Sequence, residues 1–211
     1  GLYRQRVRSI WRGVCGQDPE GLRLARNLLI SFLPAAVAGL LLHRAIKQHL
    51  FAAWPVVAAL ALGGMVMIGL DRWLLRPARA PACALESLTM RQALLIGMAQ
   101  CLSLWPGTSR AMVTIVAGLL VGLPAQAAAE YSFLLVLPTL GAATMFDALK
   151  GGSGLLAEVG WLPGLCGFAA AALVAALVMR GFVQYLSRHG LAVFGWYRLG
   201  LAAAVWVVML E

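Results

Sequence analysis

The sequence predicts an all-α, polytopic membrane protein, a bundle of hydrophobic helices with one re-entrant helix-loop-helix. Three observations support this prediction. Hydrophobic residues make up 62% of the 211 residues and charged residues only 12%, whereas soluble domains are roughly half apolar. Most of the apolar residues form stretches long enough to cross a bilayer. The apolar segment at 92–123 is instead divided in its middle by a Pro-Gly pair and polar side chains.

The charge pattern excludes nucleic acid as a partner. The formal net charge is +9, but the basic residues lie in the polar connections between apolar stretches, without the interleaved aromatic residues of a nucleic-acid groove. We interpret them as charges that orient the chain among membrane lipids. The four cysteines form no C-x-x-C pair and the three histidines have no helical i, i+4 partner, so no zinc site is predicted.

The first part of the chain predicts two transmembrane helices after a polar lead-in. Residues 1–26 contain six arginines. Helices are expected at about 27–42 and 50–70, because at 1.5 Å per residue each can approach the ~30 Å hydrocarbon core. Pro34 and Pro55 should kink or start these helices.

A Pro- and Arg-rich aqueous loop is expected at 71–91, followed by the divided segment 92–123. Its apolar halves, 92–105 and 111–123, are each ~20 Å long as helices and so too short to cross. Pro106-Gly107 excludes a single straight helix. A re-entrant hairpin satisfies the lengths, and its irregular tip is tolerated at membrane depth only when it is packed in protein or lines a wet cavity.

Three more transmembrane helices are expected at about 126–149, 161–178 and 191–209, joined by a Gly-rich turn at 150–154 and a short connection at 180–190. The connections on one side of the membrane hold six, four and two Lys or Arg residues, and those on the other side hold two and one. By the positive-inside rule the first side is cytoplasmic. This count requires the hairpin to return to the side from which it came. The whole chain, 1–211, is therefore interpreted as one integral membrane domain.

The tip of the hairpin is the candidate functional site. An ionisable side chain inside a membrane segment is costly unless it faces a cavity, a partner or a substrate, so Arg110 is a site residue by default. Thr108 and Ser109 are placed to cap the following helix, which brings free amides and the positive end of the helix dipole to the tip. An anion there would be bound by Arg110, by the amides of 107–110 and by the Ser109 hydroxyl.

Two further residues belong to this hypothesis. Thr114 lies four residues after Arg110, on the same helical face, and its hydroxyl would add a contact. Glu130 is the nearest acidic residue, and it either starts the next helix or orients Arg110 or holds a cation. The structural alternative is that Arg110 pairs with Glu130 or Asp147, or reaches the interface, and that Ser109 is only a cap.

The hairpin sequence resembles a known family. W-P-G-T-S-R-A-M-V-T, preceded by T-M-R-Q-A-L-L-I-G-M-A-Q-C-L-S-L and followed by A-A-E-Y-S-F-L-L-V-L-P-T, is similar to the second signature region of the undecaprenyl-pyrophosphate phosphatases of the bacitracin-resistance family. The similarity extends over nearly the whole chain, including the C-terminal W-Y-R-L-G-L-A-A-A-V-W. It implies an inverted-repeat fold with two re-entrant hairpins, in the bacterial cytoplasmic (inner) membrane.

The resemblance also implies an activity, the hydrolysis of undecaprenyl (C55 isoprenoid) diphosphate to the monophosphate and inorganic phosphate, which recycles the cell-wall lipid carrier. The family's P-G-x-S-R motif matches residues 106–110, and its later threonine matches Thr114. These matches imply that Arg110 clamps the diphosphate while Ser109 and Thr114 hold it or its leaving oxygen. The catalytic candidates are Arg110, Ser109 and Thr114, and the substrate-binding candidates are Gly107, Thr108 and Glu130.

The sequence departs from the family pattern in two places. Ala111 stands where the family usually has a serine. The family's N-terminal signature, a glutamate pair spaced four apart followed by P-x-S-S-T-x-H, does not occur in these residues. The resemblance assigns to that signature a histidine and the carboxylates that bind a divalent cation, Mg²⁺ or Ca²⁺, so the metal ligands are unknown here. We expect an N-terminally truncated piece of a longer enzyme, with a reduced homologue as the alternative.

Other functions and assemblies stay open at this point. A transporter or scramblase of polyprenyl phosphates is the main alternative, because broken helices and a midplane anion site are also parts of transporters. An assembly subunit without activity is a third reading. The G-x-x-x-G pair Gly118 and Gly122 permits close helix contact, with packing inside the chain favoured over a homodimer.

Overall fold

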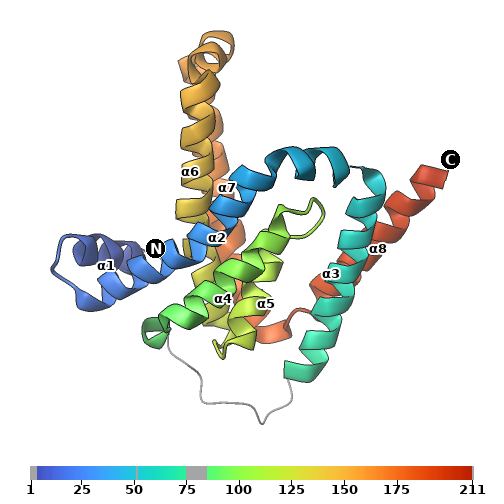
Figure 1. Cartoon of the computed structure of the whole chain (residues 1–211), viewed down its shortest axis with the longest axis horizontal. Helices are drawn as coiled ribbons and strands as arrows, with labels where there is room; N and C mark the ends of the chain where they lie inside the picture. Colours follow the sequence, from blue (N-terminus) through green and yellow to red (C-terminus); the bar gives the residue numbers. More distant parts are fainter. Residues whose placement is uncertain (1–3, 51, 75–84, 211) are drawn as a thin grey trace.

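The computed structural model describes residues 4–50, 52–74 and 85–210, with the side chains of some residues near 43–49, 150–159 and 187–189 left undescribed. All of the regular secondary structure in the described part is helical (Figure 1). Five of its helices are long and apolar enough to cross a membrane, which confirms the prediction of an all-α, polytopic membrane protein. The elements are α1 (Arg4–Val14), α2 (Pro19–His49), α3 (Ala53–Leu74), η1 (Leu85–Ser87), α4 (Met90–Gln100), η2 (Cys101–Leu104), α5 (Arg110–Leu120), α6 (Ala125–Val159), α7 (Trp161–His189) and α8 (Ala192–Leu210).

The five long helices α2, α3, α6, α7 and α8 correspond to the five predicted spans, but α2, α6 and α7 run well beyond the predicted bounds. Helix α2 covers Pro19–His49, whereas the span was predicted at about 27–42. The turn expected at 150–154 is wrong, because α6 continues to Val159. The connection expected at 180–190 is also wrong, because α7 continues to His189. Neither segment contains a proline, and α6 ends only at Gly160, whose φ of 77° is in the left-handed region. Helix α7 therefore continues through the polar residues that follow its apolar part.

The polar lead-in is helical, which the sequence analysis did not predict. Helix α1 precedes α2, and the chain between them closes on Asp18, the N-cap of α2. The Asp18 carboxylate accepts hydrogen bonds from the amides of Glu20 (3.0 Å) and Gly21 (3.2 Å), and from the Ser9 hydroxyl of α1 (2.5 Å). The Ser9 hydroxyl and then the Gly21 amide lower the pKa of Asp18, because they stabilise its charged form.

The segment predicted as a hairpin is a helix–turn–helix. Helix α4 begins with a capping box between Thr89 and Gln92, and η2 and an irregular turn connect it to α5. The Gln92 side chain donates to the carbonyl of Val121 at 2.9 Å, so the start of α4 lies beside the end of α5. The chain therefore returns to the side from which it came. Its depth in the bilayer stays a prediction, and residues 75–84 of the predicted aqueous loop lie outside the described residues.

The hairpin is held against α2 and α6 by a buried hydrogen-bond network. Ser31 of α2 bonds the Tyr131 hydroxyl of α6 at 2.6 Å, and that hydroxyl donates to the carbonyl of Asn27 at 2.9 Å. The Asn27 amide in turn donates to the carbonyl of Leu88, next to α4, at 2.7 Å. The network joins α2, the start of the hairpin and α6. Its hydrogen bonds favour one position of these helices along each other, because a shift would separate the donors from their acceptors.

Helices α3 and α8 form a separate pair beside the hairpin (Figure 1). Their backbones come close at Gly64 and Gly195, where a side chain on Gly64 would lie 2.8 Å from the Gly195 carbonyl. The Asp71 carboxylate, near the end of α3, accepts from the amide of Leu191 at 2.7 Å, just before α8 begins. The pair is thus fixed along its length and at one end.

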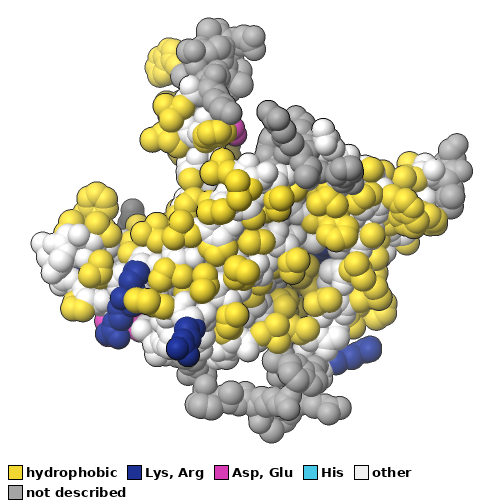
Figure 2. Space-filling view, in the orientation of Figure 1, with side chains coloured by type: hydrophobic (Ala, Val, Ile, Leu, Met, Phe, Trp, Pro, Cys, Tyr) yellow, Lys and Arg dark blue, Asp and Glu magenta, His cyan; other side chains and the backbone are white. Residues whose placement is uncertain are grey.

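Apolar side chains cover much of the outer surface, as Figure 2 shows for one face. Residues 161–182 of α7 include no buried residue within the described chain, and together with the second half of α6 they project away from the other helices (Figure 1). A surface of this kind is expected to face lipid or protein, not water. The projecting α6–α7 pair is therefore consistent with a membrane environment.

Prediction: Gly97→Ala destabilises the protein. Gly97 of α4 lies against Ser31 of α2, and an added Cβ would be 2.5 Å from the Ser31 carbonyl oxygen. The obstacle is backbone, so the helices must separate, at a cost of about 1–3 kcal/mol. Thermal unfolding in detergent measures the loss. Gly69→Ala is the matched control, because no atom lies within 4 Å of its added Cβ; equal unfolding temperatures for the two variants would contradict the close packing of α2 and α4.

Candidate active site

The tip of the hairpin, residues 105–109, is irregular because its sequence prevents a helix. Pro106 cannot continue the hydrogen-bond pattern of η2. Gly107 has φ of +93°, which a residue with a side chain rarely adopts. An added Cβ at Gly107 would also lie 2.7 Å from the carbonyl oxygen of Val56 in α3. Glycine is therefore required both for the turn and for the contact with α3.

The two hydroxyls of the tip have different roles. Ser109 is the N-cap of α5 and accepts from the amide of Met112 at 3.3 Å, which confirms the predicted cap. Thr108 does not cap α5, so that expectation is wrong. Its hydroxyl lies 2.5 Å from the carbonyl oxygen of Trp105 and 2.8 Å from that of Leu102. Thr108 thus stabilises the turn that precedes α5, and the Ser109 hydroxyl lies at the start of α5.

Arg110 is the first residue of α5 and is partly exposed. Within the part of the chain that the structure describes, its guanidinium has no acidic partner. The amides of Arg110 and Ala111 likewise have no acceptor among the described residues, because the first amides of a helix have none within it. The tip therefore presents a positive side chain beside the positive end of a helix dipole. An isolated helix would disfavour this arrangement, and an anion would stabilise it.

A second arginine, Arg198 of α8, holds the tip in place. Its side chain is only 8% exposed, and its Nη2 atom donates to the carbonyls of Gly107 (2.5 Å) and Ala59 (3.3 Å). Gly63 of α3 provides the space, because an added Cβ there would lie 2.8 Å from Nη2. The Nε atom of Arg198 is buried without a partner among the described residues.

Sequence reasoning missed Arg198, although a signal was present. An arginine between W-Y and L-G-L in an apolar span is selected by the same rule that selected Arg110. The tip has another contact with α3, where the indole of Trp105 donates to the carbonyl of Pro55 at 3.1 Å. The α3–α8 pair thus supports the tip from two directions.

Thr114 lies one turn away from the tip, inside the protein. It is 1% exposed, and its hydroxyl bonds the Ser132 hydroxyl of α6 at 2.6 Å and the Arg110 carbonyl at 2.9 Å. This position fixes α5 against α6. A direct contact between Thr114 and an anion stays a prediction, and the geometry favours an indirect role.

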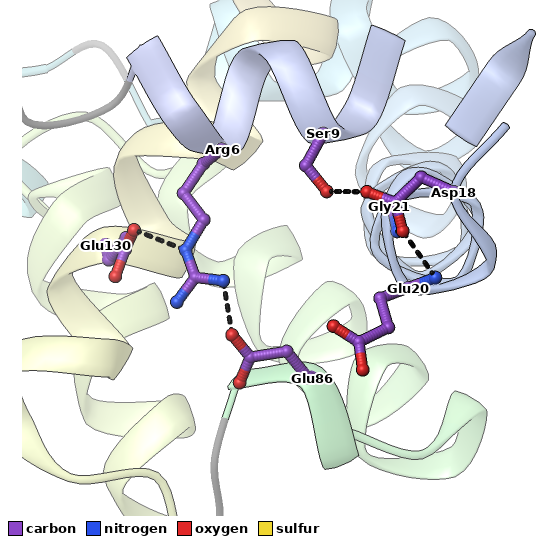
Figure 3. Close-up of polar contacts among 7 residues, drawn as sticks. All are labelled: Arg6, Ser9, Asp18, Glu20, Gly21, Glu86 and Glu130. Carbon is purple, nitrogen blue, oxygen red and sulfur yellow. Dashed lines mark hydrogen bonds and ion pairs between the residues drawn. The ribbon is translucent and has the colours of Figure 1, made fainter. Parts of the chain in front are cut away.

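The structure does not bring Glu130 to Arg110. Glu130 lies in the second turn of α6. Because Ser132 of α6 contacts Thr114 and α6 runs antiparallel to α5, Glu130 lies about six residues, or roughly 9 Å, along the helix axis from the level of Arg110. Its carboxylate accepts from Nε of Arg6 in α1 at 3.1 Å, and Arg6 also pairs with Glu86 of η1 (Figure 3). The pairing of Arg110 with Glu130, which was the structural alternative, is therefore absent. Asp147, the other carboxylate considered, is exposed on the projecting half of α6.

The residues at the tip do not fit a divalent cation. Among the described residues no group of three or more His, Cys, Asp or Glu side chains is arranged to hold a metal ion. Carboxylates and imidazoles are the usual ligands of catalytic divalent metals, and the tip offers hydroxyls, amides and an arginine. These groups are donors that suit an anion better than a cation.

The fold is that of a polytopic membrane protein with a broken helix, and the tip of that helix carries an arginine without an acidic partner among the described residues. Residues 1–204 match the family described as "Bacitracin resistance protein BacA", and the chain belongs to this family. The predicted resemblance is thereby confirmed.

Curated relatives agree with the family. The chain is 52% identical over 204 residues to "Undecaprenyl-diphosphatase" of Sorangium cellulosum (strain So ce56), covering 96% of this chain and 66% of that protein. It is 41% identical over 203 residues to "Undecaprenyl-diphosphatase 2" of Rhodospirillum rubrum, covering 96% of this chain and 72% of that protein. A protein named "Undecaprenyl-diphosphatase" in Nitrosomonas europaea is also 41% identical, over 204 residues, with coverages of 96% and 72%. The chain spans just under two thirds of the Sorangium protein's length.

Prediction: Arg198→Lys loosens the tip. A lysine ammonium is a single point of charge, and it cannot reproduce the fork that reaches the carbonyls of Ala59 and Gly107. Losing a charge-assisted hydrogen bond of this kind costs about 1.5–3 kcal/mol. Hydrogen exchange in a peptide covering 104–114 should become about tenfold faster or more, while a peptide from the start of α6 is unchanged. Arg180→Lys, exposed on α7, is the control; unchanged exchange at 104–114 would mean that Arg198 does not support the tip.

Prediction: acidification weakens the attachment of α1. A hydrogen bond from its own amide and then the Arg6 guanidinium lower the pKa of Glu86 from its ordinary value of 4.5. A carboxylate whose folded-state pKa is lowered stabilises the fold above its unfolded pKa, and this contribution is lost as the pH falls through the folded value. The unfolding temperature should therefore drop between neutral pH and pH values below 4.5. The drop should be smaller in Arg6→Gln, and the difference between the two drops should correspond to about 1 kcal/mol.

The control for this measurement is Arg23→Gln, which removes an exposed arginine of α2 and should keep the pH dependence of the unmodified chain. Parallel curves for Arg6→Gln and the unmodified chain would show that the contacts of Arg6 do not stabilise the fold.

Proposed function

We propose that this chain hydrolyses undecaprenyl diphosphate to undecaprenyl phosphate and inorganic phosphate, and that the hairpin tip binds the diphosphate. The observation that carries the proposal is Arg110, which lies without an acidic partner beside the free amides of α5, on a tip that α3 and α8 hold in place. The relatives that share up to 52% identity with the chain are named for this reaction.

The tip suits a diphosphate for reasons of geometry and charge. A guanidinium binds two phosphate oxygens at once, and the amides of Arg110 and Ala111 add donors at the helix terminus. Ser109 holds its hydroxyl at the same terminus. Because Arg198 and Trp105 fix the tip before substrate arrives, little reorganisation is needed when charge develops.

The hydrolysis breaks the bond between the terminal phosphorus and the bridging oxygen. The oxygen of a water molecule forms the new bond to phosphorus, the bridging oxygen leaves with undecaprenyl phosphate, and the proton of the water is taken up by a base. Negative charge on the transferred phosphoryl group and the leaving oxygen is the main quantity to be stabilised, and Arg110 supplies positive charge for it. No residue of the described tip is assigned as the base.

A divalent cation, Mg²⁺ or Ca²⁺, belongs to the proposal through the family resemblance alone. It would neutralise phosphate charge when bound, but the described residues form no site for it. The residues of this chain are therefore assigned only to binding the diphosphate and to stabilising its charge.

The polyprenyl tail would follow the outer face of α4. Leu94, Leu95, Met98 and Leu102 are exposed, and their spacing places them along one side of α4 and η2, from the start of the hairpin toward the tip. A tail lying on this stripe would bring its headgroup to the tip while it stays among membrane lipids. The proposed location is the bacterial inner membrane, and a homodimer stays a prediction without support from a specific contact.

The alternative, transport or scrambling of polyprenyl phosphates without hydrolysis, has no observation in its favour. The same broken helix would serve a transporter, but the curated relatives are named as diphosphatases. We therefore retain hydrolysis.

Prediction: Arg110→Ala lowers the release of inorganic phosphate from undecaprenyl diphosphate at least about a hundredfold, the usual effect of removing a group that stabilises transition-state charge. Arg110→Lys is also poor, because an ammonium cannot bind two oxygens in a fork. The measurement is phosphate release by the purified gene product in vesicles. Arg91→Ala, an exposed arginine at the start of α4, should keep the activity. Normal turnover in Arg110→Ala would remove Arg110 from the mechanism.

Prediction: chelation of divalent cations abolishes phosphate release, and addition of Mg²⁺ or Ca²⁺ restores it, because the charge of a diphosphate is rarely neutralised by one arginine alone. The unfolding temperature should stay unchanged on chelation, since no metal site stabilises the described fold. Full activity in the chelator would contradict the proposed cation while leaving the role of Arg110 to be judged by its own variants.

A further inference from the structure

Among the described residues, helix α1 contacts the rest of the chain through one of its sides. Arg6 contacts Glu86 and Glu130, Ser9 bonds Asp18, and Gly13 is buried against α2. Three contacts at positions 6, 9 and 13 define one helical face. The orientation of the opposite face is therefore fixed as well.

The opposite face, which we call the outer face of α1, consists of Val7, Trp11, Val14, Arg8 and Arg12. The exposed fractions of its apolar residues are large, at 45% for Val7, 72% for Trp11 and 65% for Val14. Their spacing of four and three residues makes one apolar stripe. Arg8 and Arg12 are also exposed and lie next to this stripe, one turn apart. Helix α1 contains no acidic residue.

The position of α1 relative to the bilayer follows from α2. A short turn connects Val14 to Pro19, where the apolar span of α2 begins, and α1 contacts α2 (Figure 1). Helix α1 has four arginines among its 11 residues, which is too much charge for the hydrocarbon core. We therefore expect it at the level where α2 enters the membrane, on the side that the positive-inside rule predicts to be cytoplasmic.

The chemistry of the outer face matches a lipid headgroup layer. Tryptophan prefers the boundary between headgroups and hydrocarbon, and arginine binds phosphate with two donors. A stripe of exposed valine and tryptophan would be unfavourable in water. The positive charges of Arg8 and Arg12 would be unfavourable in hydrocarbon, because neither guanidinium forms an ion pair among the described residues and the Asp18 carboxylate acts on Arg12 only from a distance. Amphipathic helices with basic polar faces bind anionic lipids for these reasons.

We propose that the outer face of α1 is an interfacial anchor that binds the anionic phospholipids of the leaflet at which α2 begins. Val7, Trp11 and Val14 enter the boundary region, and Arg8 and Arg12 bind headgroup phosphates. The anchor is separate from the diphosphate site, because none of these residues contacts the hairpin tip. Arg6 is not assigned to headgroup binding, because its guanidinium already forms ion pairs with Glu86 and Glu130.

The test measures which lipid lies next to Trp11. The full gene product is placed in nanodiscs of phosphatidylcholine and phosphatidylglycerol, in which one lipid or the other carries acyl-chain bromines at equal mole fraction. The fluorescence of Trp11 is taken as the difference between the unmodified chain and Trp11→Phe, which removes an exposed side chain. We expect brominated phosphatidylglycerol to quench this component more strongly than brominated phosphatidylcholine, with a local preference of roughly fivefold for each arginine.

Charge variants complete the test. Arg8→Gln combined with Arg12→Gln should remove the preference for phosphatidylglycerol and keep the quenching by phosphatidylcholine. Arg91→Gln, which removes an exposed arginine of α4, should change neither. Absence of quenching by both lipids would overturn the proposal, because Trp11 would then face water or protein. Equal quenching by both lipids in the unmodified chain would also overturn it, because the arginines would not select anionic headgroups.

Discussion

The contact between Arg198 and the carbonyl of Gly107 supports the candidate site. A helix that breaks inside an apolar protein leaves carbonyls and amides without partners, and in hydrocarbon each such group is costly. Here the Arg198 guanidinium of α8 donates to the Gly107 carbonyl. The Thr108 hydroxyl donates to the Trp105 carbonyl, and the Trp105 indole donates to the Pro55 carbonyl of α3. With its carbonyls bound, the tip can keep the first amides of α5 and the Arg110 side chain available for an anion.

The sequence predicted those features that depend on local patterns. Five long apolar helices follow from hydrophobic length, the break in the hairpin follows from Pro106-Gly107, and the cap follows from a serine before an apolar helix. The return of the hairpin to its starting side followed from the distribution of positive charge, and the contact between Gln92 and Val121 agrees with it.

The features that depend on tertiary contacts could not be predicted. Helix α1 is polar, and its position depends on contacts with the start of α2 and on partners far away in the chain, such as Glu86 and Glu130. The predicted ends of α6 and α7 fall too early, because a loss of hydropathy does not by itself end a helix. Glu130 is the acidic residue nearest to Arg110 along the sequence, but the antiparallel arrangement of α5 and α6 separates the two side chains.

The α3–α8 pair contacts the rest of the described chain at the hairpin tip and, through Phe194 and Phe182, at α7. The tip is hydrogen-bonded to both helices of this pair, so a change in their tilt must also displace Gly107. Tilt is how a membrane helix adjusts to the thickness of the bilayer around it. A change in lipid composition that alters bilayer thickness should therefore also change the distance between the first turn of α5 and the α3–α8 pair.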